Sequence, residues 1–296
     1  MRSKILSILM LSLLLLSAAC SAQATPSVPT EVVEEQAAAP AAEAESEAAA
    51  EEPVEARTLT VLAAASLTES FTELGQLFEA QNEGVTVAFS FAGSQALAEQ
   101  LGQGAAADVF ASANTKYMTA VVDAGRVNAD DAQTFAYNKL TVIYPKDNPG
   151  EITELQDLAK SGLMIILADE TVPVGKYSQQ FLDNASADAA FGSDFKEKVL
   201  ANVVSFEDNV KAVVTKISLG EADAGIVYVT DITADAAESI ATLDIPDELN
   251  TIGTYPIAPV ADSQNADLAA SFVSFVLSDE GQAVLAKYGF VNATAE

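Results

Sequence analysis

The segment LTVLAAASL, residues 59–67, ends an apolar run at one hydroxyl, Ser66, and a helix-like pattern follows it. The apolar run predicts a short buried strand, and apolar residues at helical spacing after it predict a helix. Ser66 and Glu69 also have the spacing of a capping box, in which each side chain accepts a backbone N–H at the helix start. The free amides and the dipole of a helix start favour an anion. The segment therefore predicts either a simple helix cap or an anion-binding position at Ser66.

Two later segments repeat this junction of strand and helix. The alternating run at residues 85–91 leads through Gly93 and Ser94 into a helical pattern, and the apolar run at 163–168 leads into VPVGKY at 172–177. Strands that alternate with helices form parallel sheets covered by helices. The chain is therefore predicted to be an α/β protein with several helix starts at one edge of its sheets.

The first 19 residues have the pattern of an export signal. Arg2 and Lys4 precede an apolar run at residues 5–16, and small residues precede Cys20. About a dozen apolar residues are too few for a membrane span, which needs about 20. The segment before Cys20 resembles the lipobox of bacterial lipoproteins, although Ser17 stands where that pattern usually has Leu. The resemblance implies a lipidated Cys20 that holds the protein on the outer face of a membrane; plain secretory cleavage is the alternative.

Residues 20–57 are predicted to be a disordered acidic tether. They are rich in Ala, Glu and Pro and contain no aromatic residue. Such a composition cannot bury enough apolar surface to fold, and its like charges repel one another.

Composition excludes several functions. The formal net charge is −29, and the chain has no His and no Trp. Nucleic-acid binding requires basic patches, so that partner is not expected. Triads and zinc sites that depend on His are excluded. Ser193 and Lys196 fit the S-x-x-K pattern of penicillin-binding enzymes, but the companion signatures are missing. We therefore predict that the protein is not an enzyme.

Eight segments in register resemble the molybdate-binding proteins of bacterial ABC importers. They are AAASL (63–67), SFAGS (90–94), ADVFASA (107–113), VPVGKY (172–177), EDNVKA (207–212), GIVY (225–228), YPIA (255–258) and KYGF (287–290). The resemblance runs from about residue 58 to the end of the chain.

This resemblance implies a two-lobed α/β fold of the type II periplasmic-binding-protein class. Each lobe would be a mostly parallel sheet flanked by helices, and two crossover strands would form the hinge near Asn138 and Gly253. Lobe I would comprise residues 58–138 plus 252–296, and lobe II residues 139–251.

The resemblance also implies an oxyanion site at Ser66, Ser94, Val174, Val210 and Tyr228. The serines would contribute hydroxyl and amide, the valines their amides, and the tyrosine its hydroxyl. Gly93 stands where this family often has Ser, which would remove one hydroxyl near the site. No catalytic residue, cofactor or free metal cation is implied, because molybdenum would be bound as molybdate.

The implied function is capture of molybdate, and of tungstate, outside the cytoplasm by a monomer that delivers the anion to an ABC permease. A binding protein for another small oxyanion, such as sulfate, is the main alternative. Phosphate, an amino acid or chelated iron are further alternative ligands, and a lipid-tethered adhesion protein is an alternative of another class.

Overall fold

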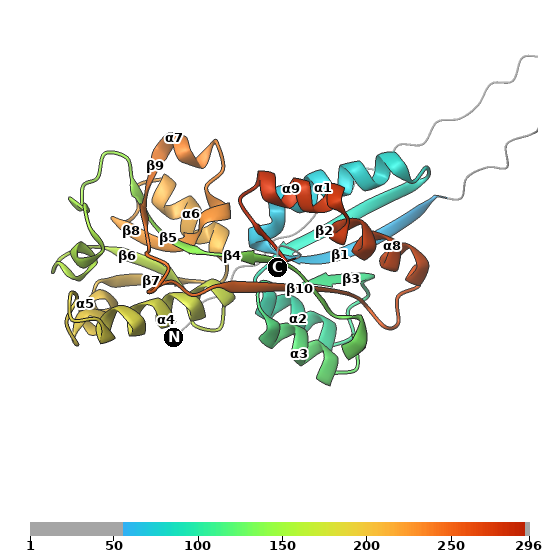
Figure 1. Ribbon diagram of the computed structural model, residues 1–296, viewed down its shortest axis with the longest axis horizontal. Helices are drawn as coiled ribbons and strands as arrows, with labels where there is room; N and C mark the ends of the chain where they lie inside the picture. The colour runs from blue at the N-terminus through green and yellow to red at the C-terminus, as the bar shows by residue number, and fades with distance from the viewer. Residues whose placement is uncertain (1–55, 294–296) are drawn as a thin grey trace, which may run out of the picture. The chain divides into compact units, whose positions relative to one another are not determined.

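Two mixed β-sheets with helices packed on their faces make up the described part of the chain, residues 56–293 of a computed structural model (Figure 1). These residues belong to one compact unit, Glu52–Glu296. The predicted signal peptide, Cys20 and almost all of the predicted tether lie outside the described residues. No single helix among residues 56–293 is long and apolar enough to cross a membrane. The helices α8 (Ala266–Leu277) and α9 (Asp279–Lys287), bent by 61° at their junction, meet the length and composition criteria only as a pair.

The first sheet has the strand order β11-β4-β10-β3-β1-β2. β1 pairs in parallel with β2 and β3, whereas β10 pairs antiparallel with β3 and β4. The strands are β1 Arg57–Ala64, β2 Val85–Ala92, β3 Val109–Ala111, β4 Gln133–Asn138, β10 Gly253–Pro259 and β11 Val291–Asn292.

The second sheet has the order β7-β6-β8-β5-β9. β6 pairs in parallel with β7 and β8, and β5 pairs antiparallel with β8 and β9. The strands are β5 Leu140–Pro145, β6 Ile165–Ala168, β7 Val203–Glu207, β8 Ala224–Tyr228 and β9 Ile240–Asp244.

The helices cover these sheets, with short 3₁₀ turns at several junctions. The helices are α1 Thr68–Gln81, α2 Ser94–Gly102, α3 Thr115–Asp123, α4 Pro173–Ala187, α5 Phe195–Ala201, α6 Val210–Ser218, α7 Ala236–Ser239, α8 Ala266–Leu277 and α9 Asp279–Lys287. The turns are η1 Ala65–Leu67, η2 Ala129–Asp131, η3 Leu155–Ala159 and η4 Val229–Asp231.

The buried face of α1 is an apolar stripe with helical spacing. Phe71, Leu74 and Phe78 recur at spacings of three and four, and all three are buried. Phe78 packs edge-on against Phe272 of α8, with ring centroids 5.2 Å apart. This packing holds α1 against α8.

The predicted α/β class with helix-flanked sheets is confirmed. The sheets are less parallel than predicted, because the strands at the crossings between the sheets, β4, β5 and β10, enter with antiparallel partners. β4, β9 and β11 were not predicted. The division into two lobes that close about a hinge stays a prediction, although the two sheets draw on the stretches 57–138 with 253–292 and 140–244.

Candidate functional site

One small cavity lies where several helix starts converge. All five residues of the predicted oxyanion site line it: Ser66, Ser94, Val174, Val210 and Tyr228. The rest of the lining is apolar or glycine: Ala64, Ala65, Ala92, Gly93, Ala113, Val172 and Pro173. About 10 Å³ is open to the centre of a sphere the size of a water molecule, and about 10–15 Å³ by that measure holds one such molecule. By this measure the space is about the size of one water molecule.

Three backbone N–H groups at this cavity have no acceptor within their own helices. Ser94 and Val210 are the first residues of α2 and α6, and Val174 is the second residue of α4. The first four N–H groups of a helix lack an intrahelical partner, and the dipole adds positive potential there. Asn209 caps α6 by accepting the N–H of Ala212 at 3.0 Å, which leaves the Val210 amide for another acceptor.

Ser66 is not a helix cap, so the predicted capping box is wrong. η1 intervenes, α1 begins at Thr68 after Leu67, and its start has no side-chain cap. The Ser66 hydroxyl lies 2.9 Å from the hydroxyl of Tyr255. Glu69 binds Lys211 instead of the backbone, with Oε2 to Nζ at 2.8 Å. The Ser66 side chain therefore bonds to Tyr255 instead of capping α1, and the residue lines the cavity.

The Ser94 hydroxyl accepts one hydrogen bond from the protein backbone. Its Oγ accepts the backbone N–H of Ala113 at 3.0 Å, and the residue is 1% exposed. A hydroxyl whose oxygen accepts one hydrogen bond still has a proton to donate. The cavity is where that proton can find an acceptor.

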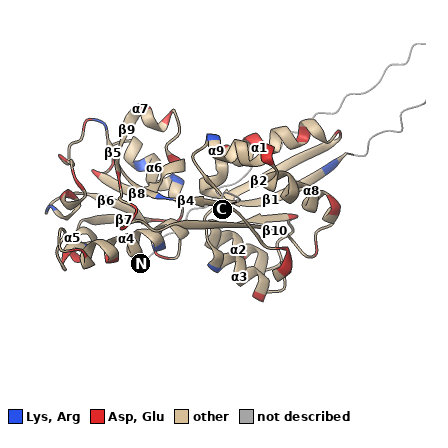
Figure 2. Ribbon diagram, in the orientation of Figure 1, with Lys and Arg blue, Asp and Glu red and all other residues tan. Residues whose placement is uncertain are grey.

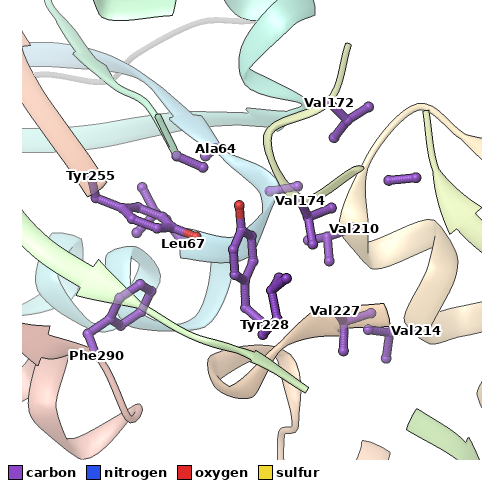
Figure 3. Packing of buried hydrophobic residues seen from close by; sticks show 14 of the residues in the cluster. Ala64, Leu67, Val172, Val174, Val210, Val214, Val227, Tyr228, Tyr255 and Phe290 are labelled. Atoms are coloured by element: carbon purple, nitrogen blue, oxygen red, sulfur yellow. The ribbon is translucent and has the colours of Figure 1, made fainter. Parts of the chain in front are cut away.

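Tyr228 brings a buried phenol to the same place. Figure 3 shows its ring between Tyr255 and the pair Val174 and Val210, with the oxygen directed toward the space between Ala64 and Val174. Among the described residues this oxygen has no hydrogen-bond partner. Burial, with a smaller effect of Tyr255, raises the pKa of Tyr228 well above its ordinary value, so the phenol keeps its proton.

Gly93 has a role that the sequence analysis did not anticipate. A Cβ at this position would lie 2.5 Å from the carbonyl oxygen of Asp208, just before α6. Gln95 makes a bond across the same gap, from Nε2 to the Asp208 oxygen at 2.7 Å. Gly93 therefore permits a close approach of the α6 start to the α2 start, in addition to lacking a hydroxyl.

A cluster of charges lies beside the cavity but not in its lining. Lys211 contacts Glu69 and the fully buried Asp231, with Nζ to Asp231 Oδ1 at 3.3 Å. Burial opposes the charge on Lys211, but the two carboxylates together raise the pKa of Lys211. Over the rest of the fold acidic side chains predominate, for example on α1 and α8 (Figure 2). The cavity itself is lined by neutral groups.

The S-x-x-K pattern lies elsewhere. Ser193 is exposed, and Lys196 donates to Asp183 at 2.7 Å. The Lys196 ammonium group is therefore paired with a carboxylate.

The cavity thus presents hydroxyl and amide donors, apolar walls and no charged side chain. Such a set is suited to a small anion whose atoms only accept hydrogen bonds. That these five residues bind an anion stays a prediction.

Comparisons with known proteins identify the family of this chain. The model of the family described as bacterial extracellular solute-binding proteins matches residues 59–291. The molybdate-binding protein ModA of Mycobacterium tuberculosis (strain H37Rv) is 37% identical over 235 residues, which cover 79% of this chain and 85% of that protein.

Two solved structures share the fold. The periplasmic molybdate-binding protein of Azotobacter vinelandii superposes with a TM-score of 0.68 at 22% identity, covering 79% of this chain and 98% of its own. The sulfate-binding protein SubI of Mycobacterium tuberculosis has a TM-score of 0.72 at 20% identity, covering 80% and 88%. Because the two differ in ligand, the fold by itself does not select the anion.

Proposed function

This chain belongs to the family of bacterial extracellular solute-binding proteins, and from that premise we propose that it captures molybdate and delivers it to the permease of an ABC importer. The observation that carries the choice of ligand class is the buried phenol of Tyr228, unpartnered among residues 56–293, in a cavity of neutral donors. Molybdate near neutral pH is a dianion without protons, so all its oxygens accept hydrogen bonds.

The donor set favours molybdate over phosphate. Hydrogen phosphate carries a proton and needs an acceptor in its site. One of the two lone pairs of the Ser94 oxygen is used by Ala113, and the lining contains no carboxylate, the strongest kind of acceptor. A buried donor without an acceptor costs about 1–3 kcal/mol, which penalises the protonated anion.

Sulfate has the same acceptors as molybdate and differs in size, so hydrogen bonding does not separate the two. The relative at 37% identity, which is named for molybdate, favours molybdate. Tungstate is nearly isosteric with molybdate, and we propose that it binds as well.

The donors are sufficient for tight binding without a cation in the cavity. Hydrogen bonds to a charged group contribute about 1.5–3 kcal/mol each, so five such bonds supply about 7–15 kcal/mol before ordering costs. A nanomolar complex requires about 12 kcal/mol.

The proposal extends to the N-terminus and to assembly. The mature protein would begin at a lipidated Cys20 and act as a monomer on the outer face of a membrane. The acidic segment that follows Cys20 would give the binding unit reach toward the permease.

Isothermal titration tests the proposal, with the chain from residue 20 carrying Cys20→Ser and with molybdate, tungstate, sulfate and phosphate in one buffer. We expect tight binding of the first two anions only. Ser66→Ala and Ser94→Ala should each weaken molybdate binding by at least about tenfold, whereas Ser193→Ala, an exposed serine outside the cavity, should not. No response to molybdate, or stronger binding of sulfate, would refute the proposal.

A further inference from the structure

A chain of hydrogen bonds runs from β4 and β10 of the first sheet to the cavity. The side chain of Asn138, the last residue of β4, donates from Nδ2 to the Tyr255 hydroxyl at 3.2 Å. Tyr255 lies on β10, and its hydroxyl is 2.9 Å from Ser66. Asn138 and Tyr255 are both fully buried. β4 and β10 are antiparallel neighbours in the first sheet, and the chain crosses to the second sheet after β4 and returns at β10 (Figure 1).

The direction of these hydrogen bonds is fixed by Asn138, at the end of the chain of bonds that is remote from the cavity. The Oδ1 atom of Asn138 accepts the backbone N–H of Lys139 at 2.9 Å, so the amide nitrogen must face the other way. That nitrogen has two protons, which go to Thr230 at 2.7 Å and to Tyr255. The Tyr255 oxygen is therefore an acceptor for Asn138.

We assign the proton of Tyr255 to Ser66, the other hydrogen-bond partner of this hydroxyl among residues 56–293. If Ser66 donated to Tyr255 instead, the buried phenol proton would have no acceptor, which costs about 1–3 kcal/mol. Burial raises the pKa of Tyr255, so this proton stays in place at physiological pH. The Ser66 oxygen accepts from Tyr255, and its own proton is left to point into the cavity.

On the basis of the proposed function, we propose that Tyr255 and Asn138 are positioning residues that fix Ser66 as a hydrogen-bond donor to the bound oxyanion. Neither residue lines the cavity. Together with the Ala113 amide, which does the same for Ser94, they turn both cavity hydroxyls into donors. The site thereby favours an anion without protons and disfavours hydrogen phosphate.

A double-mutant cycle measured by isothermal titration with molybdate tests this inference. Tyr255→Phe should weaken binding about three- to tenfold in the otherwise wild-type protein, because the Ser66 hydroxyl loses its fixed orientation. In a Ser66→Ala background the same change should cost less than about twofold, since there is no hydroxyl left to orient. In a Ser94→Ala background, the matched control, it should again cost about three- to tenfold.

The selectivity of the single variant provides a second readout. We expect the ratio of the dissociation constants for phosphate and molybdate to fall in Tyr255→Phe, because a free Ser66 hydroxyl can accept the proton of hydrogen phosphate. Ser66→Ala should lack this gain in phosphate binding, because it has no such acceptor.

Two results separate the possible failures. A wild-type protein that does not bind molybdate would refute the proposed function and this inference with it. Molybdate binding by the wild type, with Tyr255→Phe equally costly in the Ser66→Ala background, would overturn the inference alone.

Should Tyr255→Phe fail to fold, as judged by thermal unfolding, Asn138→Asp takes its place in the cycle. A carboxylate at 138 accepts from Tyr255, so Ser66 must donate to Tyr255 and turn its oxygen toward the anion. The loss of molybdate affinity should then be smaller in the Ser66→Ala background than in the otherwise wild-type protein. An equal loss in both backgrounds would refute the inference that Asn138 and Tyr255 fix Ser66 as a donor.

Discussion

Tyr228→Phe should change stability and affinity in opposite directions. The phenol oxygen has no partner among the described residues, and the residue is 1% exposed. A buried polar group without a partner costs about 1–3 kcal/mol, so its removal should stabilise the protein without ligand. For a domain of about this size each kcal/mol raises Tm by about 2–4 °C. The same hydroxyl is expected to donate to the anion, so its loss should weaken molybdate binding about 10- to 150-fold.

Thermal unfolding of the ligand-free protein and titration calorimetry measure the two effects on the same preparations. Tyr288→Phe is the matched control, because its hydroxyl already donates to Glu73 at 2.7 Å, outside the cavity. That variant should lose stability and keep its affinity for molybdate. A Tyr228→Phe protein with a lower Tm and unchanged affinity would refute the interpretation of Tyr228 as a donor held ready for a ligand.

Three further perturbations test other parts of the structure. Gly93→Ala places a Cβ 2.5 Å from the Asp208 carbonyl oxygen, where ordinary contacts begin at 3.4 Å, so the start of α6 must move away by about 1 Å. Calorimetry should then show molybdate binding weaker by more than about tenfold. Unchanged affinity would contradict the close approach of α2 and α6. Burial opposes the charge of Asp157, but hydrogen bonds from Thr153 help to lower the pKa of Asp157 to about 2. Its stabilising effect is therefore present above the unfolded pKa of about 3.9 and is lost as pH falls toward 2. Asp157→Asn should lower Tm at pH 7 and make the decrease of Tm between pH 4 and 2 smaller than in the wild type. Parallel curves of Tm against pH for the two proteins would contradict this. The formal net charge of −29 repels an approaching anion. Added inert salt screens this repulsion over about 8 Å at 0.15 M, so it should speed association of the anion in stopped-flow experiments. An association rate that falls with added salt would refute this prediction.

Local patterns predicted the junctions that make the cavity. The apolar run before Ser66, the Gly-Ser pair at 93–94 and the Pro at 173 each mark the end of a strand and the start of a helix, and the structure has a junction at each. Such signals lie within a few residues of one another along the chain. They can therefore be found without knowledge of the fold.

Contacts between distant segments were not predictable in this way. The partner of the Ser66 hydroxyl, Tyr255, is 189 positions away in sequence. The spacing of Ser66 and Glu69 suggested a capping box, yet tertiary contacts took both side chains, one to Tyr255 and the other to Lys211. Tertiary interactions of this kind override a local preference worth about 1 kcal/mol.

The same limit applies to Gly93. Along the sequence its distinctive feature is the absence of a hydroxyl. In the fold its distinctive feature is the absence of a Cβ opposite the Asp208 carbonyl. β4 was missed for a related reason, because its six residues, QTFAYN, mix polar and apolar side chains and are fixed by pairing with β10 and β11.

The amide donors at Val174 and Val210 have a consequence for how this cavity can evolve and be studied. A backbone N–H is present whatever side chain the residue bears, so substitutions at either position can accumulate while the donor stays in place. An alanine scan would report on Ser66, Ser94 and Tyr228 and would leave the two amide donors undetected. Proline would delete such a donor at position 210, because it has no N–H and fits the first position of a helix. The extended backbone of Asn209 already suits a following proline. If the proposed site is correct, part of the specificity is encoded by the path of the main chain.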